Sequence, residues 1–248
     1  MWAILSGIEG NLAAYEAVLA DIKQQRFSKG TLTPRLVEEL YILGDVIAAN
    51  SDSNRLIERL QSPRSRELTP QICQGWWEEQ LLILHGLGRS GEPTELIDRY
   101  GSEMVKTLWE AIDISHLPWV RSLDFGFFEL DCLLIHGSTV GVSDEITPAT
   151  PPVEILDRLL RMDANYLFCG RSGLAFQYEV AAGQMTSAVT TLDYPSSPRT
   201  TTLKPRQIIG VGNVGRIPGY ATYTLYEPST GWVKFQIVRY GAARGFQS

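Results

Sequence analysis

At 248 residues the chain is long enough for one large α/β domain or two small ones, and its 44% hydrophobic and 20% charged residues are typical of a globular protein. A formal net charge of -6 gives no electrostatic reason to expect nucleic acid or an anionic membrane as a partner, which leaves proteins and small molecules. No apolar run approaches the roughly 20 residues of a membrane span, and the first residues lack the basic region of a signal peptide, so we expect a cytoplasmic protein. The cysteines, Cys73, Cys132 and Cys169, lie in or beside apolar runs and are expected to be buried thiols.

The first 22 residues predict a strand, a tight turn and a helix. Residues 2–5 form a continuous apolar run, which favours a strand buried on both faces. From residue 12 to residue 22 the apolar side chains follow a helical spacing, and Asn11 stands before them as a candidate N-cap. Gly7 and Gly10 bracket the turn, so ligand-binding chemistry is expected at this strand end.

The rest of the chain continues the alternation of apolar runs and helical spacing. Strands are predicted over residues 40–46, 70–74, 125–130, 132–136, 165–170, 176–189, 207–215, 220–226 and 232–240. Helices are predicted over residues 56–60, 80–114 with an interruption at 86–93, and 151–162. Residues 192–206 are rich in Ser, Thr and Pro, and we expect a mobile loop there within a single domain of residues 1–248.

The segment Ser6-Gly-Ile-Glu-Gly-Asn11, followed by its helix, resembles the first motif of the calcineurin-like metallophosphoesterases, which usually reads Ser-Asp-x-His-Gly-Asn. Where that family carries a metal-binding aspartate and histidine, this chain has Gly7 and Glu9. Further stretches resemble later motifs of the family in the right order: Gly44-Asp45, Gly75-Trp76-Trp77, His136-Gly137-Ser138, Gly170-Arg171-Ser172-Gly173 and residues 207–215.

The resemblance implies an α/β fold, a four-layer αββα sandwich of two mixed β-sheets flanked by helices, with the site at the strand ends along one edge. It also implies a phosphoesterase with two bound metal ions. Of the family's metal ligands, however, only Asp45 and His136 remain here, and Glu9 could replace a third. The other positions hold Gly7, Trp76, Arg171 and Gly173.

Two substitutions indicate that the metal chemistry is lost. An indole has one N–H donor and no lone pair for a metal, so Trp76 and Trp77 are expected to line or fill the site. The permanent charge of Arg171 would repel a metal ion and could pair with Asp45 and Glu9 instead. We therefore expect no cofactor and no confident catalytic residue, only a degenerate cluster of Gly7, Glu9, Asn11, Asp45, Trp76, Trp77, His136, Arg171 and Gly173.

Three functional hypotheses follow. The first is a catalytically inactive binding or regulatory module with an unknown protein partner. The second is a hydrolase with a rewired site, in which one Mn, Fe or Zn ion is held by Glu9, Asp45 and His136. The third is a metal-free module that binds a phosphate, a nucleotide or another small phosphorylated ligand through Arg171 and the amides before Leu12.

Overall fold

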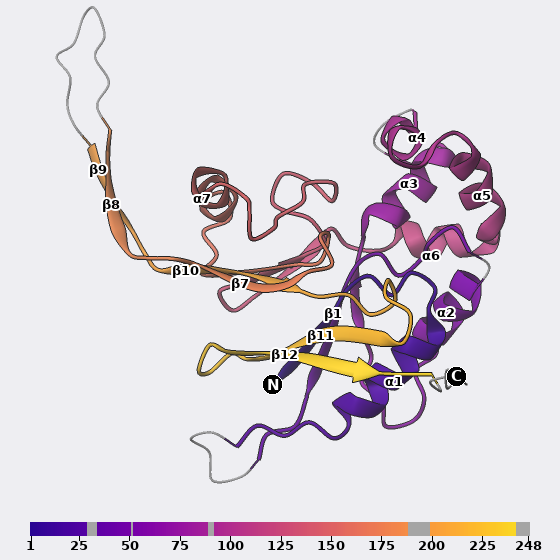
Figure 1. The fold of residues 1–248 in the computed structure, drawn as a ribbon, viewed down its shortest axis with the longest axis horizontal. Helices are drawn as coiled ribbons and strands as arrows, with labels where there is room; N and C mark the ends of the chain where they lie inside the picture. The colour runs from indigo at the N-terminus through magenta and orange to yellow at the C-terminus, as the bar shows by residue number, and fades with distance from the viewer. Residues whose placement is uncertain (29–33, 51, 89–91, 188–198, 242–248) are drawn as a thin grey trace, which may run out of the picture.

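A computed structural model describes residues 1–28, 34–50, 52–88, 92–187 and 199–241 (Figure 1). Its first sheet has five strands in the order β12-β11-β1-β2-β3. These strands are β1 (Trp2–Leu5), β2 (Glu39–Leu43), β3 (Gln71–Cys73), β11 (Tyr220–Glu227) and β12 (Trp232–Arg239). Neighbours among β1, β2 and β3 run parallel, whereas β11 pairs antiparallel with β1 and with β12.

The second sheet repeats this mixed pattern in the order β4-β5-β6-β10-β7. Its strands are β4 (Gly126–Glu129), β5 (Cys132–Ile135), β6 (Tyr166–Cys169), β7 (Ala175–Val180) and β10 (Arg206–Val211). The central strands β5, β6 and β10 are parallel, and the outer strands β4 and β7 are antiparallel to their neighbours. Each sheet therefore has three parallel strands, and their carboxyl ends lie together at one edge of that sheet.

The described helices are α1 (Leu12–Ile22), α2 (Asp52–Gln61), α3 (Trp76–Leu84), α4 (Thr94–Tyr100), α5 (Glu103–Ala111), the 3-10 helix η1 (Ile114–His116), α6 (Leu117–Arg121) and α7 (Pro152–Leu160). The alternation of β1 shows why its apolar run is continuous. Ala3 and Leu5 pack with the helices on the outer face, whereas Trp2 and Ile4 lie in the core between the two sheets. A strand buried on both faces has no position for a polar side chain.

The layers follow from three hydrophobic clusters. The first lies between the first sheet and the helices that cover it, the second between the two sheets, and the third between the second sheet and α7. Phe168 and Ile209 face the first sheet, whereas Ile155 and Leu159 of α7 cover the opposite face of the second sheet. The structure thus confirms the predicted four-layer αββα sandwich of two mixed sheets.

Other predictions are confirmed or corrected at this level. The three cysteines are buried free thiols, as predicted. The helical segment predicted at 80–114 is wrong in its start, because α3 begins at Trp76. The interruption predicted at 86–93 is confirmed, since α3 ends at Leu84 and α4 begins at Thr94, and the part after it is divided into α4 and α5. Among the described residues no helix is long and apolar enough to cross a membrane.

The loop predicted at 192–206 also needs correction. Residues 199–203 form strand β9 (Arg199–Leu203), which pairs antiparallel with β8 (Gly183–Ser187), and β10 begins at Arg206. Residues 192–198 lie outside the described residues. Threonine is β-branched and favours an extended strand, so the threonines of this run form a strand although its Ser/Thr/Pro-rich composition predicts a loop. Figure 1 shows the β8–β9 ribbon projecting away from the two sheets.

Candidate functional site

The strand ends of both sheets meet around the turn after β1. The backbone N–H of Glu9 donates to the carbonyl of Asp45, after β2, at 2.9 Å, and the N–H of Val214, after β10, donates to the carbonyl of Ser6 at 3.0 Å. In the second sheet, the N–H of Arg171 donates to the carbonyl of His136 at 2.8 Å. The bond between Val214 and Ser6 joins segments 208 residues apart in the sequence, which brings the loops after β1 and β10 together.

Asp45 lies at the centre of this site and is fully buried. Its backbone is in the left-handed region, with a φ of 50°, an uncommon conformation for a residue other than glycine. Oδ1 accepts a hydrogen bond from the backbone N–H of Trp77 at 3.0 Å. Oδ2 lies 2.8 Å from Nη2 of Arg216 and 3.3 Å from Nε2 of His136. A carboxylate at the end of β2 is thus surrounded by donors.

The main cation of the site is Arg216, which the sequence analysis did not single out. Its Nη2 donates to Asp45, its Nε donates to Oε1 of Glu9 at 2.6 Å, and its Nη1 donates to the carbonyl of Arg171 at 3.0 Å. One guanidinium therefore bridges two carboxylates and a loop of the second sheet. The sequence feature that could have identified Arg216 is its position directly after the glycine-rich turn that follows β10.

Two glycines make room for this guanidinium. A Cβ at Gly7 would lie 3.2 Å from Nε of Arg216, and a Cβ at Gly173 would lie 2.5 Å from Nη1. Both positions carry metal ligands in the family that the sequence resembles. The side chain of Arg216 therefore occupies space next to which that family places a carboxylate and an imidazole.

Arg171 lies beside the cluster rather than at its centre. Its side chain is 5% exposed, and Nη1 is 3.9 Å from Oδ2 of Asp45, too far for a good hydrogen bond. The guanidinium carbon instead lies 4.7 Å from the ring centroid of Trp76, the arrangement of a cation–π contact. Nε and Nη2 of Arg171 are buried and have no hydrogen-bond partner among the described residues.

The two tryptophans begin α3 and differ in their roles. Trp76 is fully buried against Arg171, and the two indoles pack edge to face with centroids 4.9 Å apart. Trp77 meets Asp45 through its backbone N–H, and its ring packs on Tyr100. Asn11 takes no part in the charged cluster: its Oδ1 accepts from the N–H of Ala14 and caps α1, as its position predicted.

A second carboxyl group that sequence reasoning underrated is Glu78, in the first turn of α3. It is fully buried and accepts four backbone hydrogen bonds, at 2.8 to 3.0 Å, from the N–H groups of Asp45, Val46, Ile47 and Gly75. The Gly75-x-x-Glu78 spacing, which resembles that of a capping box, could have predicted that Glu78 accepts a hydrogen bond from the backbone N–H of Gly75.

The electrostatics of the site follow from burial and these contacts. Burial disfavours the charged forms of His136 and Asp45. The attraction between the two charges nevertheless raises the pKa of His136 and contributes to lowering the pKa of Asp45. Nδ1 of His136 donates to the carbonyl of Leu43 at 2.7 Å, whereas Nε2 lies 3.3 Å from Oδ2 of Asp45 as an ion pair without hydrogen-bond geometry. Burial raises the pKa of Glu9 despite Arg216, and burial with the Asp45 charge raises the pKa of Glu78 to about 7.

A dinuclear metal centre does not fit these residues. Two metal ions need a bridging carboxylate and about three further ligands each, with lone pairs directed at the metal. Here the oxygens of Asp45 and Glu9 accept hydrogen bonds from Arg216, and the facing positions are two glycines and an indole. No group of three His, Cys, Asp or Glu side chains in the described part of the chain has the geometry to hold a metal ion.

Comparisons with known proteins identify the fold. No family model matches the sequence, and no curated protein does. A hypothetical protein from Pyrococcus horikoshii OT3 has a similar structure, with a TM-score of 0.67 and 19% identity, over 97% of this chain and 88% of that one. A metallophosphoesterase from Sphaerobacter thermophilus is similar with a TM-score of 0.63 and 20% identity, over 96% of this chain and 88% of that one. At this level of identity the likeness shows that the chain has a metallophosphoesterase-like fold.

Proposed function

We propose that this protein with a metallophosphoesterase-like fold is a catalytically inactive binding or regulatory module in which an arginine replaces the metal centre. The observation that supports the proposal is the single guanidinium of Arg216, which bridges Glu9 and Asp45 at 2.6 and 2.8 Å. Two close carboxylates without a cation would repel each other and drive a proton onto one of them. Arg216 provides the positive charge that a metal would otherwise supply.

The replacement removes the chemistry as well as the metal. Bound metal ions polarise a phosphoryl oxygen and lower the pKa of an attacking water, whereas a guanidinium cannot ligate water or generate hydroxide. His136 is already engaged by Leu43 on one side and by Asp45 on the other. The Asp45 carboxylate also raises the pKa of His136, which disfavours the neutral imidazole that a general base requires.

The direct test is the metal content and activity of the purified full-length protein. We expect less than one Mn, Fe or Zn ion per chain after growth in medium enriched in these metals. We also expect no hydrolysis of bis(p-nitrophenyl) phosphate above background. Stoichiometric metal, or hydrolysis that a chelator abolishes, would favour the hydrolase with a mononuclear site on Glu9, Asp45 and His136 and overturn the proposal.

Replacing Arg216 tests the role of the guanidinium itself. Arg216→Ala leaves Asp45 and Glu9 without their closest cation, so we expect it to lower the free energy of unfolding. Breaking a buried pair typically costs ~3–5 kcal/mol, and the loss should lie at or below the lower end because a quarter of this side chain is exposed. Arg121→Ala on the surface of α6 is the control and should be neutral. A neutral Arg216→Ala variant would show that the bridge does not hold the site together.

One observation favours a second function, a metal-free phosphate or nucleotide binder. The two nitrogens of Arg171 without a described partner are donors that a buried acceptor would satisfy. A thermal-shift titration with inorganic phosphate should then stabilise the wild-type protein and leave Arg171→Met unaffected. Equal shifts in the two proteins would exclude Arg171 as the anion-binding group.

A further inference from the structure

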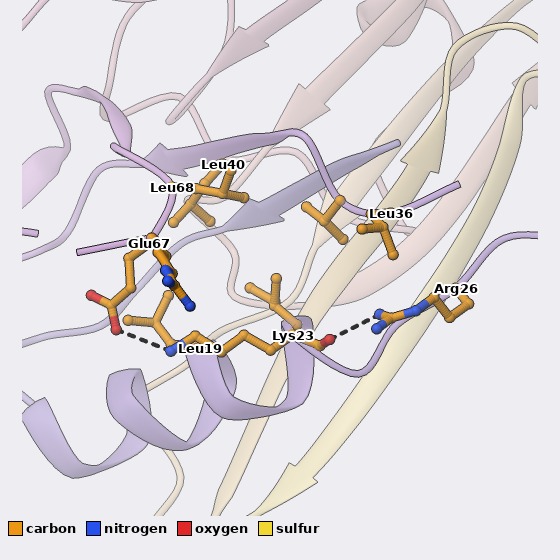
Figure 2. A pocket seen from close by; sticks show the side chains of 10 residues that line it. Leu19, Lys23, Arg26, Leu36, Leu40, Glu67 and Leu68 are labelled. Atoms are coloured by element: carbon orange, nitrogen blue, oxygen red, sulfur yellow. Dashed lines mark hydrogen bonds and ion pairs between the residues drawn. The ribbon is translucent and has the colours of Figure 1, made fainter. Parts of the chain in front are cut away.

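A cavity lies at the opposite end of α1 and β2 from the charged site (Figure 2). Glu9 and Asn11 precede the N-terminus of α1, whereas the cavity is bordered by the last turns of that helix, at Leu19 and Ile22. Because α1 has 11 residues, the two sites are separated by about 16 Å of helix. The cavity has a volume of about 210 Å³ and is open to solvent.

The walls of the cavity are aliphatic. Leu19 and Ile22 come from α1, Leu40 from the start of β2, and Leu68 from the segment before β3. Figure 2 shows these leucines facing one space between the helix and the sheet, with Leu36 on the outer side. Leu36 is 49% exposed, so apolar surface here is open to water. Removing such surface from water is favourable, by about 25 cal/mol per Å².

The rim of the cavity carries an excess of positive charge. Nζ of Lys23 pairs with Glu67 at 3.2 Å, and Glu67 is also neutralised by Arg59 at 2.5 Å. Arg26 donates from Nη1 to the carbonyls of Lys23 and Gln25 and has no carboxylate partner among the described residues. Arg66 is exposed and has no ion pair or hydrogen bond among the described residues. Two cations therefore remain at the edge of an apolar cavity in a chain whose net charge is -6.

We propose that this cavity binds a small amphipathic carboxylate, such as a medium-chain fatty acid, with its chain on the leucines and its carboxylate at Arg66 and Arg26. The size fits a small ligand. An apolar cavity of about 150 Å³ holds benzene, and drug-sized ligands occupy pockets of about 300–1,000 Å³. A guanidinium forms two parallel hydrogen bonds with a carboxylate, so the rim selects an anionic head group over a neutral or cationic one.

Binding in this cavity does not depend on whether the charged site around Asp45 holds a metal ion. None of the residues that line the cavity belongs to the charged cluster around Asp45. A protein with an active metal centre could still bind the carboxylate, and an inactive one could fail to bind it. The two proposals therefore succeed or fail in separate experiments.

Isothermal titration of the full-length protein with octanoate tests the binding. We expect one saturable site, and affinity for octanol, which has the same chain without the charge, lower by about tenfold or more. Arg66→Glu should weaken octanoate binding by at least the same factor because it places a carboxylate beside the ligand head group. Arg121→Glu is a matched charge reversal on the surface of α6 and should leave the affinity unchanged.

A second variant tests the apolar wall. Leu36→Asp puts a charge where the acyl chain is expected to lie and should abolish saturable binding. If this variant does not fold, Arg66→Glu decides alone, since Arg66 is exposed and its replacement removes no described contact. Absence of saturation with octanoate, equal affinity for octanol, or an Arg66→Glu variant that binds as tightly as the wild type would each overturn the proposal.

Discussion

Arg216 differs from a metal ion in ways that matter for the whole site. Its guanidinium is part of the chain, so no chelator removes it. Burial disfavours its charged form, but the charges of Glu9 and Asp45 outweigh that effect and raise its pKa. It also has fixed hydrogen-bond directions, which a spherical ion lacks. The strand ends around Asp45 are therefore held in one arrangement without dependence on metal supply.

A single carboxylate far from this site should make stability depend on pH. The hydrogen bond from Arg59 lowers the pKa of Glu67 from 4.5 to about 2, against the opposing effect of burial. A folded-state pKa below the unfolded value means that the stabilisation is present above pH 4.5 and is lost as the pH falls to about 2. Glu67→Gln should therefore be less stable than the wild type at neutral pH, and the difference should shrink across this window.

Urea unfolding at a series of pH values measures that difference. The exposed Glu110→Gln variant on α5 is the control and should show a small, nearly constant difference from the wild type. A Glu67→Gln deficit that is the same at all pH values would show that Arg59 does not stabilise the ionised carboxylate.

At the scale of elements, the junction between β2 and α3 depends on Glu78. Its two oxygens accept the N–H groups of three successive residues after β2, starting at Asp45, and that of Gly75 before α3. Gly75 is needed for this close approach, because a Cβ there would lie 2.0 Å from the backbone nitrogen of Asp45. The first turn of α3 and the end of β2 therefore form one unit.

Replacing Glu78 by glutamine should loosen this unit. A carboxamide keeps one acceptor oxygen and turns an NH₂ group toward two of the four backbone donors, which then lose their partner. We expect Glu78→Gln to lower the free energy of unfolding in urea by about 2–4 kcal/mol. Glu103→Gln, in the exposed first turn of α5, is the matched control and should cost less than about 0.5 kcal/mol. A neutral Glu78→Gln would show that the backbone donors do not depend on the carboxylate.

At the scale of the whole molecule, the β8–β9 ribbon stands apart from the four layers (Figure 1). Within the part of the chain that the structure describes, these two strands pair only with each other, in a two-stranded sheet separate from the two large ones. Isolated two-stranded ribbons are marginally stable in water, so the ribbon adds little to the stability of the body. It continues from β7 and β10, which pair with each other up to Val180 and Arg206.

Removing the ribbon should leave the body intact. Deleting residues 182–204 and replacing Ala181 and Pro205 by Asn-Gly would close β7 and β10 with a two-residue hairpin turn. We expect the free energy of unfolding to change by less than about 1 kcal/mol and the circular dichroism of the body to be retained. A loss of several kcal/mol would show that the ribbon packs against the body.

The sequence by itself determined the alternation of strands and helices and the positions of Asp45 and His136 at strand ends, whereas the arrangement in two sheets was implied by the family resemblance. It could do so because periodicity and turn residues are local properties, and because a run buried on both faces reads as continuously apolar. Only the tertiary structure decided which cation meets Asp45. Arg171 stands at a motif position, yet the closer guanidinium belongs to Arg216, 171 residues further along the chain than Asp45. Such a pairing depends on which loops of the two sheets face each other and on the space left by Gly7 and Gly173, neither of which local patterns encode.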